Sequence, residues 1–333
     1  MLDRYARQVI LPQIGVEGQK RLSEKRVLVA GCGALGTHTA EALLRAGIKN
    51  LILVDRDIVE IHNLHRVSLY TPQDVGRPKA EVAAEKLIAI DPEANIEFHV
   101  AHFAPKLAAE LLPKVDMVVD GLDNLETRYL VNDACVKHEK PWVYTAVLST
   151  YGMTMPIVPE KGPCFRCLFP NPPGPGTIPT CAEAGILGPV PMALAAIQAA
   201  TALAVLLESP DLRPGELLYL DLWGKKTQTV HVERASNCPT CVAREFEFLQ
   251  RAAPAVTLCG DAVQILPKEK ISLDLVALAR RLRDLGRAEI KNGLLFFESG
   301  GVSFTVFPDG RALIKGVADP NRAQALYEQF ITR

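Results

Sequence analysis

The chain has 333 residues, with 37 Lys or Arg against 38 Asp or Glu, and a formal net charge of −1 at pH 7. This length predicts about two domains with a large buried core, and the balanced charge excludes nucleic acid or an anionic membrane as the main partner. The first residues are charged and lack an apolar stretch, so we expect no signal peptide. Eight cysteines in such a chain favour metal and thiol chemistry in a reducing cytoplasm over a disulfide framework.

A glycine-rich turn near the N-terminus is the most informative segment. Its glycines, spaced as GxGxxG, are Gly31, Gly33 and Gly36. The turn stands between a strand-like and a helix-like segment, and Asp55 follows about 20 residues later. Glycines allow close approach of the backbone to a ligand, the helix N-terminus attracts phosphate, and a carboxylate at this distance binds ribose hydroxyls. The pattern predicts a nucleotide site, although a plain tight turn would also use glycine.

The N-terminal part of the sequence alternates between strand-like and helix-like segments. Predicted strands lie at 26–31, 50–54, 95–103, 115–120 and 141–147. Predicted helices lie at 35–47, 78–90, 105–113 and 126–139. This alternation predicts an α/β fold with a Rossmann-like, mostly parallel sheet.

Charged residues downstream of the turn extend the predicted site. Two cations, Arg66 and Lys79, and a second acid, Asp123, follow in sequence. Cations that neutralise phosphate oxygens, with a carboxylate that can hold Mg²⁺, are suited to attack on a phosphate ester. Structural explanations exist for single residues: the cations as solvated surface charges, Asp123 as a helix N-cap, and Arg128 as a partner of Glu126 or Asp123. The ordered set favours phosphate chemistry.

Two segments stand out after the predicted strands. Residues 169–179 form a proline- and glycine-rich loop, and Cys181 follows it. Residues 190–207 are almost wholly apolar. They could form a short membrane span, but Gln198 and Thr201 favour a buried helix, for which a dimer interface is one location.

Two CxxC pairs, about 70 residues apart, suggest a metal site. Four thiolates suit one tetrahedral Zn²⁺ in a closed structural site. A redox CxxC and unrelated buried thiols are the alternatives, and two pairs in one reducing compartment favour zinc. The candidate ligands are Cys164, Cys167, Cys238 and Cys241. Predicted packing cysteines are Cys32, Cys135 and Cys259.

The C-terminal segment, 255–333, is expected to form a separate α+β module after a linker at 251–254. Predicted strands lie at 263–266, 294–297, 303–307 and 311–314, with helices at 273–285 and 321–331. A hairpin turn is predicted at Pro308-Asp-Gly310. The pattern resembles a curved sheet like that of TATA-binding protein. It carries no evident catalytic set, so partner docking or structural support is the expected role.

Residues 1–250 resemble the MoeB/ThiF family, the prokaryotic relatives of ubiquitin-activating enzymes. The entry segment Asp3-Arg-Tyr-Ala-Arg-Gln8, the two CxxC pairs and Thr180-Cys-Ala-Glu-Ala-Gly185 match the family's motifs. Its nucleotide motif is matched in order by Gly31, Gly33, Gly36, Asp55, Asp57, Asn63, Arg66, Lys79, Asp123, Asn124 and Arg128. Three positions depart from many members: Ala34, His65 and Val67.

The resemblance implies ATP-dependent adenylation of the C-terminal Gly-Gly carboxylate of a ubiquitin-like sulfur carrier, with release of pyrophosphate before sulfur transfer. In that reaction Asp55 would bind ribose, Asn63 would orient phosphate oxygens, and Asp123 would hold Mg²⁺. Arg66 and Lys79 would contact phosphates.

The resemblance also implies partners. Arg7 would reach the phosphates of a second subunit, which predicts a homodimer. Cys181 would take part in covalent sulfur transfer or remain an idle thiol, and a cysteine desulfurase or rhodanese could supply the sulfur. Carriers of thiamin, molybdopterin and tRNA-thiolation pathways all fit these motifs.

Three other functions compete with carrier adenylation. An NAD-dependent dehydrogenase is favoured only by the glycine turn, and no acid or base for hydride transfer stands out. A tRNA-modifying dehydratase of the same superfamily, also ATP-dependent, would be expected to carry a basic stretch. A binding subunit without catalysis would have no need of Arg66, Lys79 and Asp123.

Overall fold

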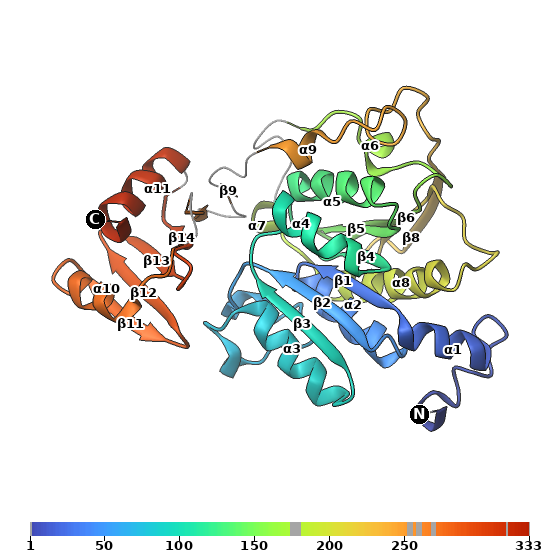
Figure 1. Cartoon of the computed structure of the whole chain (residues 1–333), viewed down its shortest axis with the longest axis horizontal. Coiled ribbons are helices and arrows are strands. Elements are labelled where there is room, and N and C mark those ends of the chain that lie inside the picture. Colours follow the sequence, from blue (N-terminus) through green and yellow to red (C-terminus); the bar gives the residue numbers. More distant parts are fainter. Residues whose placement is uncertain are drawn as a thin grey trace. The chain divides into compact units, whose positions relative to one another are not determined.

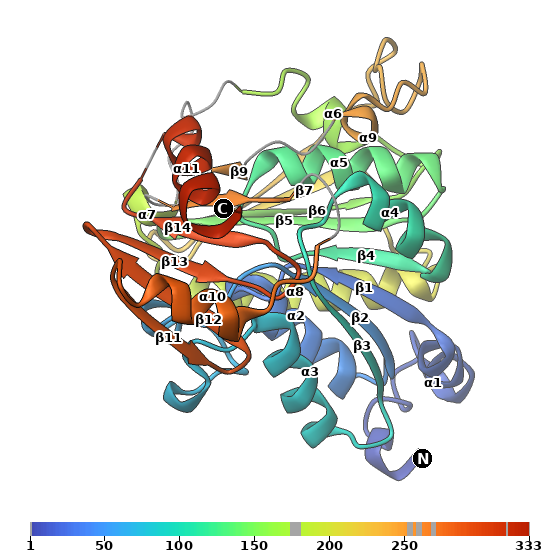
Figure 2. The same ribbon diagram turned by 60° about the vertical axis from the view of Figure 1, so that its left-hand side comes forward.

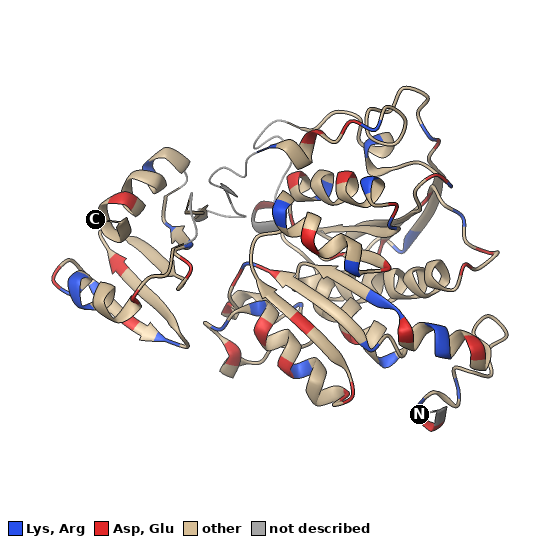
Figure 3. Cartoon of the chain, viewed as in Figure 1, with Lys and Arg blue, Asp and Glu red and all other residues tan. Residues whose placement is uncertain are grey.

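The structure is a computed structural model that describes residues 2–173, 181–251, 256–257, 262–267, 271–317 and 319–332. The chain divides into two compact units, Met1–Arg251 and Ala252–Arg333 (Figure 1). Basic and acidic residues are interspersed along the helices of the first unit (Figure 3). The assignment of the two units to an adenylation domain and a separate module stays a prediction.

The described part of the first unit is built on an eight-stranded sheet with the order β3-β2-β1-β4-β5-β6-β7-β8. The strands are β1 (Arg26–Ala30), β2 (Asn50–Asp55), β3 (Asn95–Val100), β4 (Met117–Asp120), β5 (Trp142–Leu148), β6 (Tyr151–Ile157), β7 (Glu216–Asp221) and β8 (Lys226–His231). The first five run parallel, and β6 to β8 continue the sheet by antiparallel pairing. Strand order reverses between β1 and β4, where an open α/β sheet forms its ligand crevice. The predicted mostly parallel α/β sheet is confirmed.

Helices cover both faces of the parallel strands because side chains alternate along each strand. Val27 and Val29 of β1 belong to one apolar core, whereas Leu28 and Ala30 belong to the other. Figures 1 and 2 show α4 and α5 on one side of the sheet and α2, α3 and α8 on the other. The helices of this unit are α1 (Gly15–Glu24), α2 (Ala34–Arg45), α3 (Lys79–Ile90), α4 (Pro105–Leu111), α5 (Leu125–Lys137), α6 (Phe165–Leu168), α7 (Cys181–Ala184), α8 (Pro189–Leu206) and α9 (Glu247–Gln250).

Helix α8 is the apolar segment for which a buried helix was the preferred prediction. Within the described residues it is the one helix long and apolar enough to cross a membrane, and half of that stretch is buried inside the protein. It packs against α2, β5 and β6. The fully buried Gln198 accepts a hydrogen bond from the Thr39 hydroxyl at 2.6 Å and donates to the Asp120 and Val143 carbonyls. These bonds identify α8 as a core helix, so that prediction is confirmed.

The described part of the second unit contains an antiparallel sheet with the order β11-β12-β13-β14-β10-β9. Its elements are β9 (Val256–Thr257), β10 (Ala262–Ile265), α10 (Leu275–Leu282), β11 (Arg287–Lys291), β12 (Leu294–Ser299), β13 (Val302–Val306), β14 (Ala312–Lys315), α11 (Pro320–Tyr327) and a π-helical turn (Glu328–Thr332). Both helices contribute to one apolar core with the sheet. The predicted hairpin turn at 308–310 joins β13 to β14. A likeness to TATA-binding protein stays a prediction.

Several boundaries differ from the sequence-based expectations. Helix α10 begins later than 273 because the Asp274 side chain caps it, accepting hydrogen bonds from the Val276 and Ala277 amides. The expected strands at 95–103 and 115–120 are shorter. The elements that were not predicted include α1, α6, α7, β7, β8, β9 and β11. The expected linker at 251–254 and the proline-rich loop at 169–179 lie largely outside the described residues.

Candidate nucleotide site and metal centre

The glycine turn joins β1 to α2 at the point where strand order reverses. Gly31 has a φ of +98°, and a Cβ atom there would lie 2.4 Å from the Gly121 carbonyl oxygen. A Cβ on Gly36 would lie 1.8 Å from the Gly31 carbonyl oxygen. Only glycine fits these positions, because the turn is pressed between α2 and the chain leaving β4. Gly33 is the N-cap of α2, so free helix amides begin at this turn.

Asp55 ends β2 and holds the glycine turn in place. Its carboxylate accepts hydrogen bonds of 2.7 Å from the Cys32 amide and 2.7 Å from the Asp57 amide. Burial raises the pKa of Asp55, and the nearby Lys79 ammonium opposes that rise. Each carboxylate oxygen can accept a second hydrogen bond. The binding of ribose by Asp55 stays a prediction. Its hydrogen bond with the Cys32 amide of the glycine turn was not predicted from the sequence.

Lys79 is the first residue of α3, and its side chain is only 12% exposed. Its Nζ atom lies 3.1 Å from the Asp57 carboxylate. Burial lowers the pKa of Lys79, but Asp57, Asp55 and Asp123 outweigh burial and raise it, so the ammonium stays charged. The alternative of a solvated surface lysine is therefore wrong. A buried cation lies beside the turn, where phosphate would be expected.

Asn63 and Arg66 come from a one-turn 3₁₀ helix, η2 (Ile61–Asn63), and the residues after it. The Asn63 side chain is buried and accepts a hydrogen bond from the Glu60 amide at 3.2 Å. The half-buried Arg66 donates to the His62 carbonyl at 2.7 Å. Arg66 is thus partly exposed, and its interpretation as a surface charge stays open. The contacts of both residues with phosphate stay predictions.

The segment after β4 carries the second acid. Asn124 is the N-cap of α5 and accepts the Thr127 amide at 2.9 Å. Asp123 is exposed, and one of its oxygens accepts a hydrogen bond from Asn124 at 3.2 Å. The alternative of Asp123 as the N-cap is wrong, because its neighbour takes that position. Its carboxylate is exposed and close enough to Lys79 to raise the pKa of that residue, a position in which it could hold a cation.

Arg128 holds the segment after β4 in place by binding two of its groups. Its guanidinium pairs with Asp120 at 2.8 Å and donates to the Leu122 carbonyl at 2.6 Å. The expected alternative partners, Glu126 and Asp123, are therefore wrong. Burial raises the pKa of Asp120, and the Arg128 charge counteracts this rise. The sequence analysis assigned no role to Asp120, because only the fold brings its carboxylate into contact with the guanidinium.

Arg7 lies apart from this cluster within one chain. It is exposed in the segment before α1, and the adjacent Gln8 donates to the Ala46 carbonyl at the far end of α2. A helix of 12 residues is about 18 Å long. The glycine turn begins the same helix, so the structure does not bring Arg7 to the glycine turn of its own chain.

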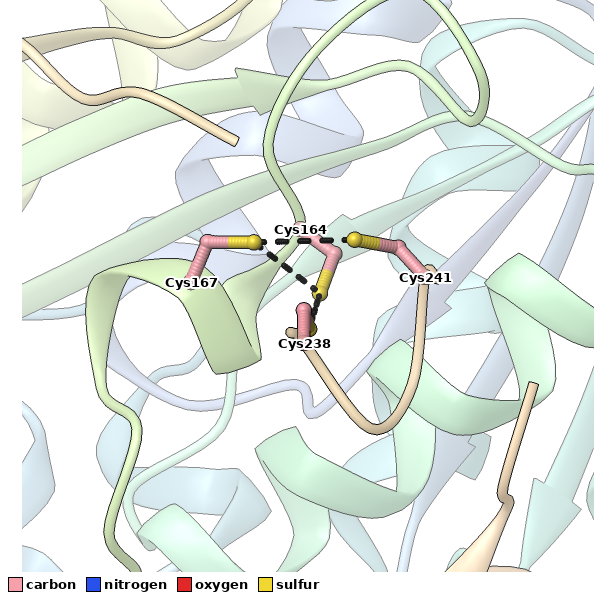
Figure 4. A group of neighbouring side chains, drawn as sticks. All are labelled: Cys164, Cys167, Cys238 and Cys241. Atoms are coloured by element: carbon pink, nitrogen blue, oxygen red, sulfur yellow. Dashed lines mark hydrogen bonds between the residues drawn. The ribbon is translucent and has the colours of Figure 1, made fainter. Parts of the chain in front are cut away.

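The four predicted metal ligands do converge. The four sulfur atoms lie within 4.8 Å of one another. Figure 4 shows Cys164 and Cys167, around α6, facing Cys238 and Cys241 from the turn after β8. Sulfur separations of 4.0, 3.6 and 3.5 Å are close to the distance of about 3.8 Å that tetrahedral zinc–sulfur bonds of about 2.3 Å require. The residues therefore fit a Cys₄ zinc ion.

Hydrogen bonds from residues near the cysteines hold the turn with Cys238 and Cys241 in place. Asp133 of α5 accepts the Thr240 hydroxyl at 3.0 Å and the Phe248 amide at 2.9 Å. Burial raises the pKa of Asp133 to about 6. Such outer contacts orient ligand-bearing turns.

The sequence suggested that Cys181 lies in an open loop, and this expectation is wrong. It is the first residue of α7. The chain after α7 is tied to the β5–β6 turn, because the Ser149 amide donates to the Gly185 carbonyl at 2.9 Å and the Leu187 amide donates to the Ser149 carbonyl. The preceding residues, 174–180, lie outside the described part. Cys32 and Cys135 are buried, as expected of packing residues, whereas Cys259 lies outside the described residues.

A glycine turn at the strand-order reversal, with an adjacent acid–lysine cluster, defines a nucleotide-binding α/β protein. The chain belongs to the ThiF family, whose family model matches residues 5–240. This confirms the family resemblance found in the sequence.

Three named relatives are similar to this chain over long stretches. The sulfur carrier protein adenylyltransferase of Thermus thermophilus is 44% identical over 72% of this chain and 90% of its own. The sulfur carrier protein ThiS adenylyltransferase of Bacillus subtilis is 38% identical over 99% of this chain and 100% of its own. The SAMP-activating enzyme E1 of Haloferax volcanii is 40% identical over 72% of this chain and 88% of its own.

Solved structures share the fold. A crystal structure of E. coli MccB with MccA-N7isoASN has a TM-score of 0.63 at 23% identity, over 72% of this chain and 74% of that one. A crystal structure of PaaA has a TM-score of 0.59 at 19% identity, over 70% and 74%. At such identities the likeness concerns the fold.

Proposed function

We propose that this protein uses ATP to adenylate the C-terminal carboxylate of a ubiquitin-like sulfur carrier. The observation that carries this proposal is the charged Lys79 ammonium, buried beside the glycine turn and within reach of Asp57, Asp55 and Asp123. A dehydrogenase needs no such cation near the phosphates of its cofactor. The match over whole chains to an enzyme named for ThiS adenylylation points to the same reaction.

In the proposed reaction, a carboxylate oxygen of the carrier's terminal glycine attacks the α-phosphorus of ATP. The bond between that phosphorus and the bridging oxygen breaks, which gives the carrier acyl-adenylate and pyrophosphate. No side chain of the protein is needed as a nucleophile. The protein holds the reactants in line and neutralises the negative charge that gathers on the phosphates.

Each predicted site residue has a place in this scheme. Asp55 would bind the ribose, Asn63 and Arg66 the phosphate oxygens, and Lys79 the phosphates beside the turn. The remaining contacts would come from the turn glycines, Asp57 and Asn124. Asp123, exposed after β4, would hold Mg²⁺, which neutralises phosphate charge when bound. The four cysteines would hold Zn²⁺ in a structural role, since four sulfurs leave no position for substrate.

Carrier-dependent exchange of pyrophosphate into ATP tests the proposal. Asp123→Ala should abolish exchange without unfolding the protein, because the side chain is exposed and its partner Asn124 retains the helix cap. Glu126→Ala is the matched control: another exposed carboxylate, on the first turn of the same helix, which should leave exchange unchanged. Full exchange by Asp123→Ala would contradict the assignment. Rapid reduction of NAD with small alcohols or acids would indicate the dehydrogenase.

The proposed catalytic unit is a homodimer with shared sites. Arg7 is exposed and about one helix length from the turn of its own chain, as a residue acting on a partner would be. Subunits carrying Arg7→Ala, mixed with subunits carrying Asp123→Ala, should regain part of the exchange activity through hybrid sites. Proven subunit exchange without any recovery would refute shared sites.

The carrier can be found by capture of small proteins ending in Gly-Gly from native cytosol. A sulfur donor, such as a cysteine desulfurase or rhodanese, would act after adenylation. Cys181 would serve this later step or none. The cytoplasm suits the free thiols seen in the described residues.

A further inference from the structure

Tyr70 connects two parts of the proposed nucleotide site without carrying a charge itself. Its side chain is only 6% exposed, and in the sequence the residue lies between η2 and a second 3₁₀ turn, η3 (Pro72–Asp74). The hydroxyl is 2.8 Å from the Cys32 carbonyl oxygen and 3.0 Å from the Lys79 carbonyl oxygen. The first carbonyl belongs to the glycine turn and the second to the start of α3, so one buried group joins two separate elements.

These contacts close a ring of short interactions, which we call the nucleotide ring: Tyr70, Cys32, Asp55, Asp57 and Lys79. The Cys32 amide donates to Asp55, and the other oxygen of Asp55 accepts the Asp57 amide. The Asp57 side chain then pairs with the Lys79 ammonium at 3.1 Å, and the Lys79 amide donates to the Asp57 carbonyl at 2.9 Å. Tyr70 completes the ring from the turn to Lys79. Movement of either element would therefore disturb the other.

The hydroxyl acts as a donor throughout the working pH range. Burial and the neighbouring Cys32, Asp55 and Asp74 raise the pKa of Tyr70, so it remains protonated. Its proton can be donated to either carbonyl or shared between them. A phenylalanine at this position would leave both carbonyl oxygens without that donor.

We infer that Tyr70 is a positioning residue for nucleotide binding, because it fixes the phosphate-facing amides of the glycine turn relative to the Lys79 ammonium. The inference rests on the proposed function, since it assumes that phosphates bind between these two groups. The phenol ring contributes packing that Tyr70→Phe would retain. Only the hydroxyl link between the two elements is removed by that variant.

The first test measures binding without any carrier. Calorimetric titration of the full chain with Mg²⁺ and a non-hydrolysable ATP analogue should give a Kd about tenfold higher for Tyr70→Phe, the effect of losing one buried hydrogen bond. Tyr129→Phe is the matched control, because that buried tyrosine donates its hydroxyl to the Phe169 carbonyl at 3.0 Å in the same unit. It should leave the Kd for the analogue unchanged. Binding by Tyr70→Phe as tight as wild type would overturn the inference.

Exchange kinetics separate positioning from a general loss of stability. With the carrier present, Tyr70→Phe should raise the KM for ATP and leave the KM for the carrier unchanged. Combination with Asp57→Asn, which breaks the same ring, should cost less than the sum of the two single losses. Equal increases in both KM values, or strictly additive losses, would contradict positioning.

Failure of this inference can be distinguished from failure of the adenylation proposal. If the wild type binds the analogue but shows no exchange with any carrier, the proposed function fails while the Kd comparison still tests Tyr70. If Tyr70→Phe does not fold, hydrogen exchange on the wild type replaces it. The analogue should then slow amide exchange across 68–71, and unaltered exchange there would refute the inference.

Discussion

Gly36→Ala adds a single methyl group at the point where α2 packs on the glycine turn. A Cβ there would lie 1.8 Å from the Gly31 carbonyl oxygen and 2.8 Å from the Gly31 carbonyl carbon. Cβ atoms in proteins essentially never come within 3.0 Å of another non-bonded heavy atom, so the added Cβ would lie about 1.2 Å too close to the oxygen. Both neighbouring atoms are backbone, so no side chain can rotate away to relieve it.

The magnitude follows from two opposing effects. Overpacking of this kind costs about 3 kcal/mol, the upper part of the usual range, because the backbone must move. Alanine in place of a helical glycine regains about 1 kcal/mol of helix propensity. Gly36→Ala should therefore lower the free energy of unfolding by about 2 kcal/mol and also weaken ATP binding, because the shifted turn carries the phosphate-facing amides.

Gly33→Ala distinguishes a methyl group that clashes with the protein itself from one that clashes only with the bound nucleotide. A Cβ at Gly33 has its nearest neighbour at 4.0 Å, the Gly121 carbonyl oxygen, so the fold has room for it. Urea unfolding should show a loss of about 1 kcal/mol, from backbone conformation alone, while binding of an ATP analogue falls. Wild-type stability and binding in Gly36→Ala would refute this reasoning.

Three further predictions concern metal, pH and the remaining thiol. Cys164→Ser should lose the one zinc per chain that metal analysis finds in the wild type; a folded wild-type protein without metal would rule out the Cys₄ site. Burial opposes ionisation of Asp74, but hydrogen bonds from Thr71 outweigh it and lower the pKa of Asp74. Asp74→Asn should therefore cost about 1 kcal/mol of unfolding free energy at pH 7, a deficit that shrinks as the pH falls below about 4 and that a pH-independent difference would contradict. Cys181→Ser should leave pyrophosphate exchange nearly unchanged, since adenylation needs no thiol. If this variant also loads sulfur onto the carrier at the wild-type rate, Cys181 has no part in sulfur transfer.

The sequence determined the elements whose signals are local. Strands β1, β2 and β4 are continuous apolar runs because helices cover both their faces, and the predicted and observed segments overlap. The glycine turn is readable because Gly31 needs a positive φ and Gly36 has no space for a side chain. The two CxxC pairs indicated the Cys₄ cluster because thiolates at that spacing suit one metal ion.

Strands whose side chains face solvent left weaker signals. Every residue of β8 is exposed. Its sequence therefore lacks the alternation of apolar and polar residues that marks a half-buried strand. Strand β11 is likewise mostly exposed. Pairing with β7 and β12, respectively, makes them strands through backbone hydrogen bonds, which do not depend on side-chain type.

Tertiary structure alone decided the partners of the charged and polar groups. Arg128 had acids nearby in sequence, but the turn after β4 brings Asp120 beneath it. The fold likewise buried Lys79 against Asp57 and placed the Tyr70 hydroxyl between two carbonyls from separate elements. The physical reason is that hydrogen bonds and ion pairs require contact within a few ångströms, and side chains far apart in sequence reach that distance only when the sheet and its helices have packed.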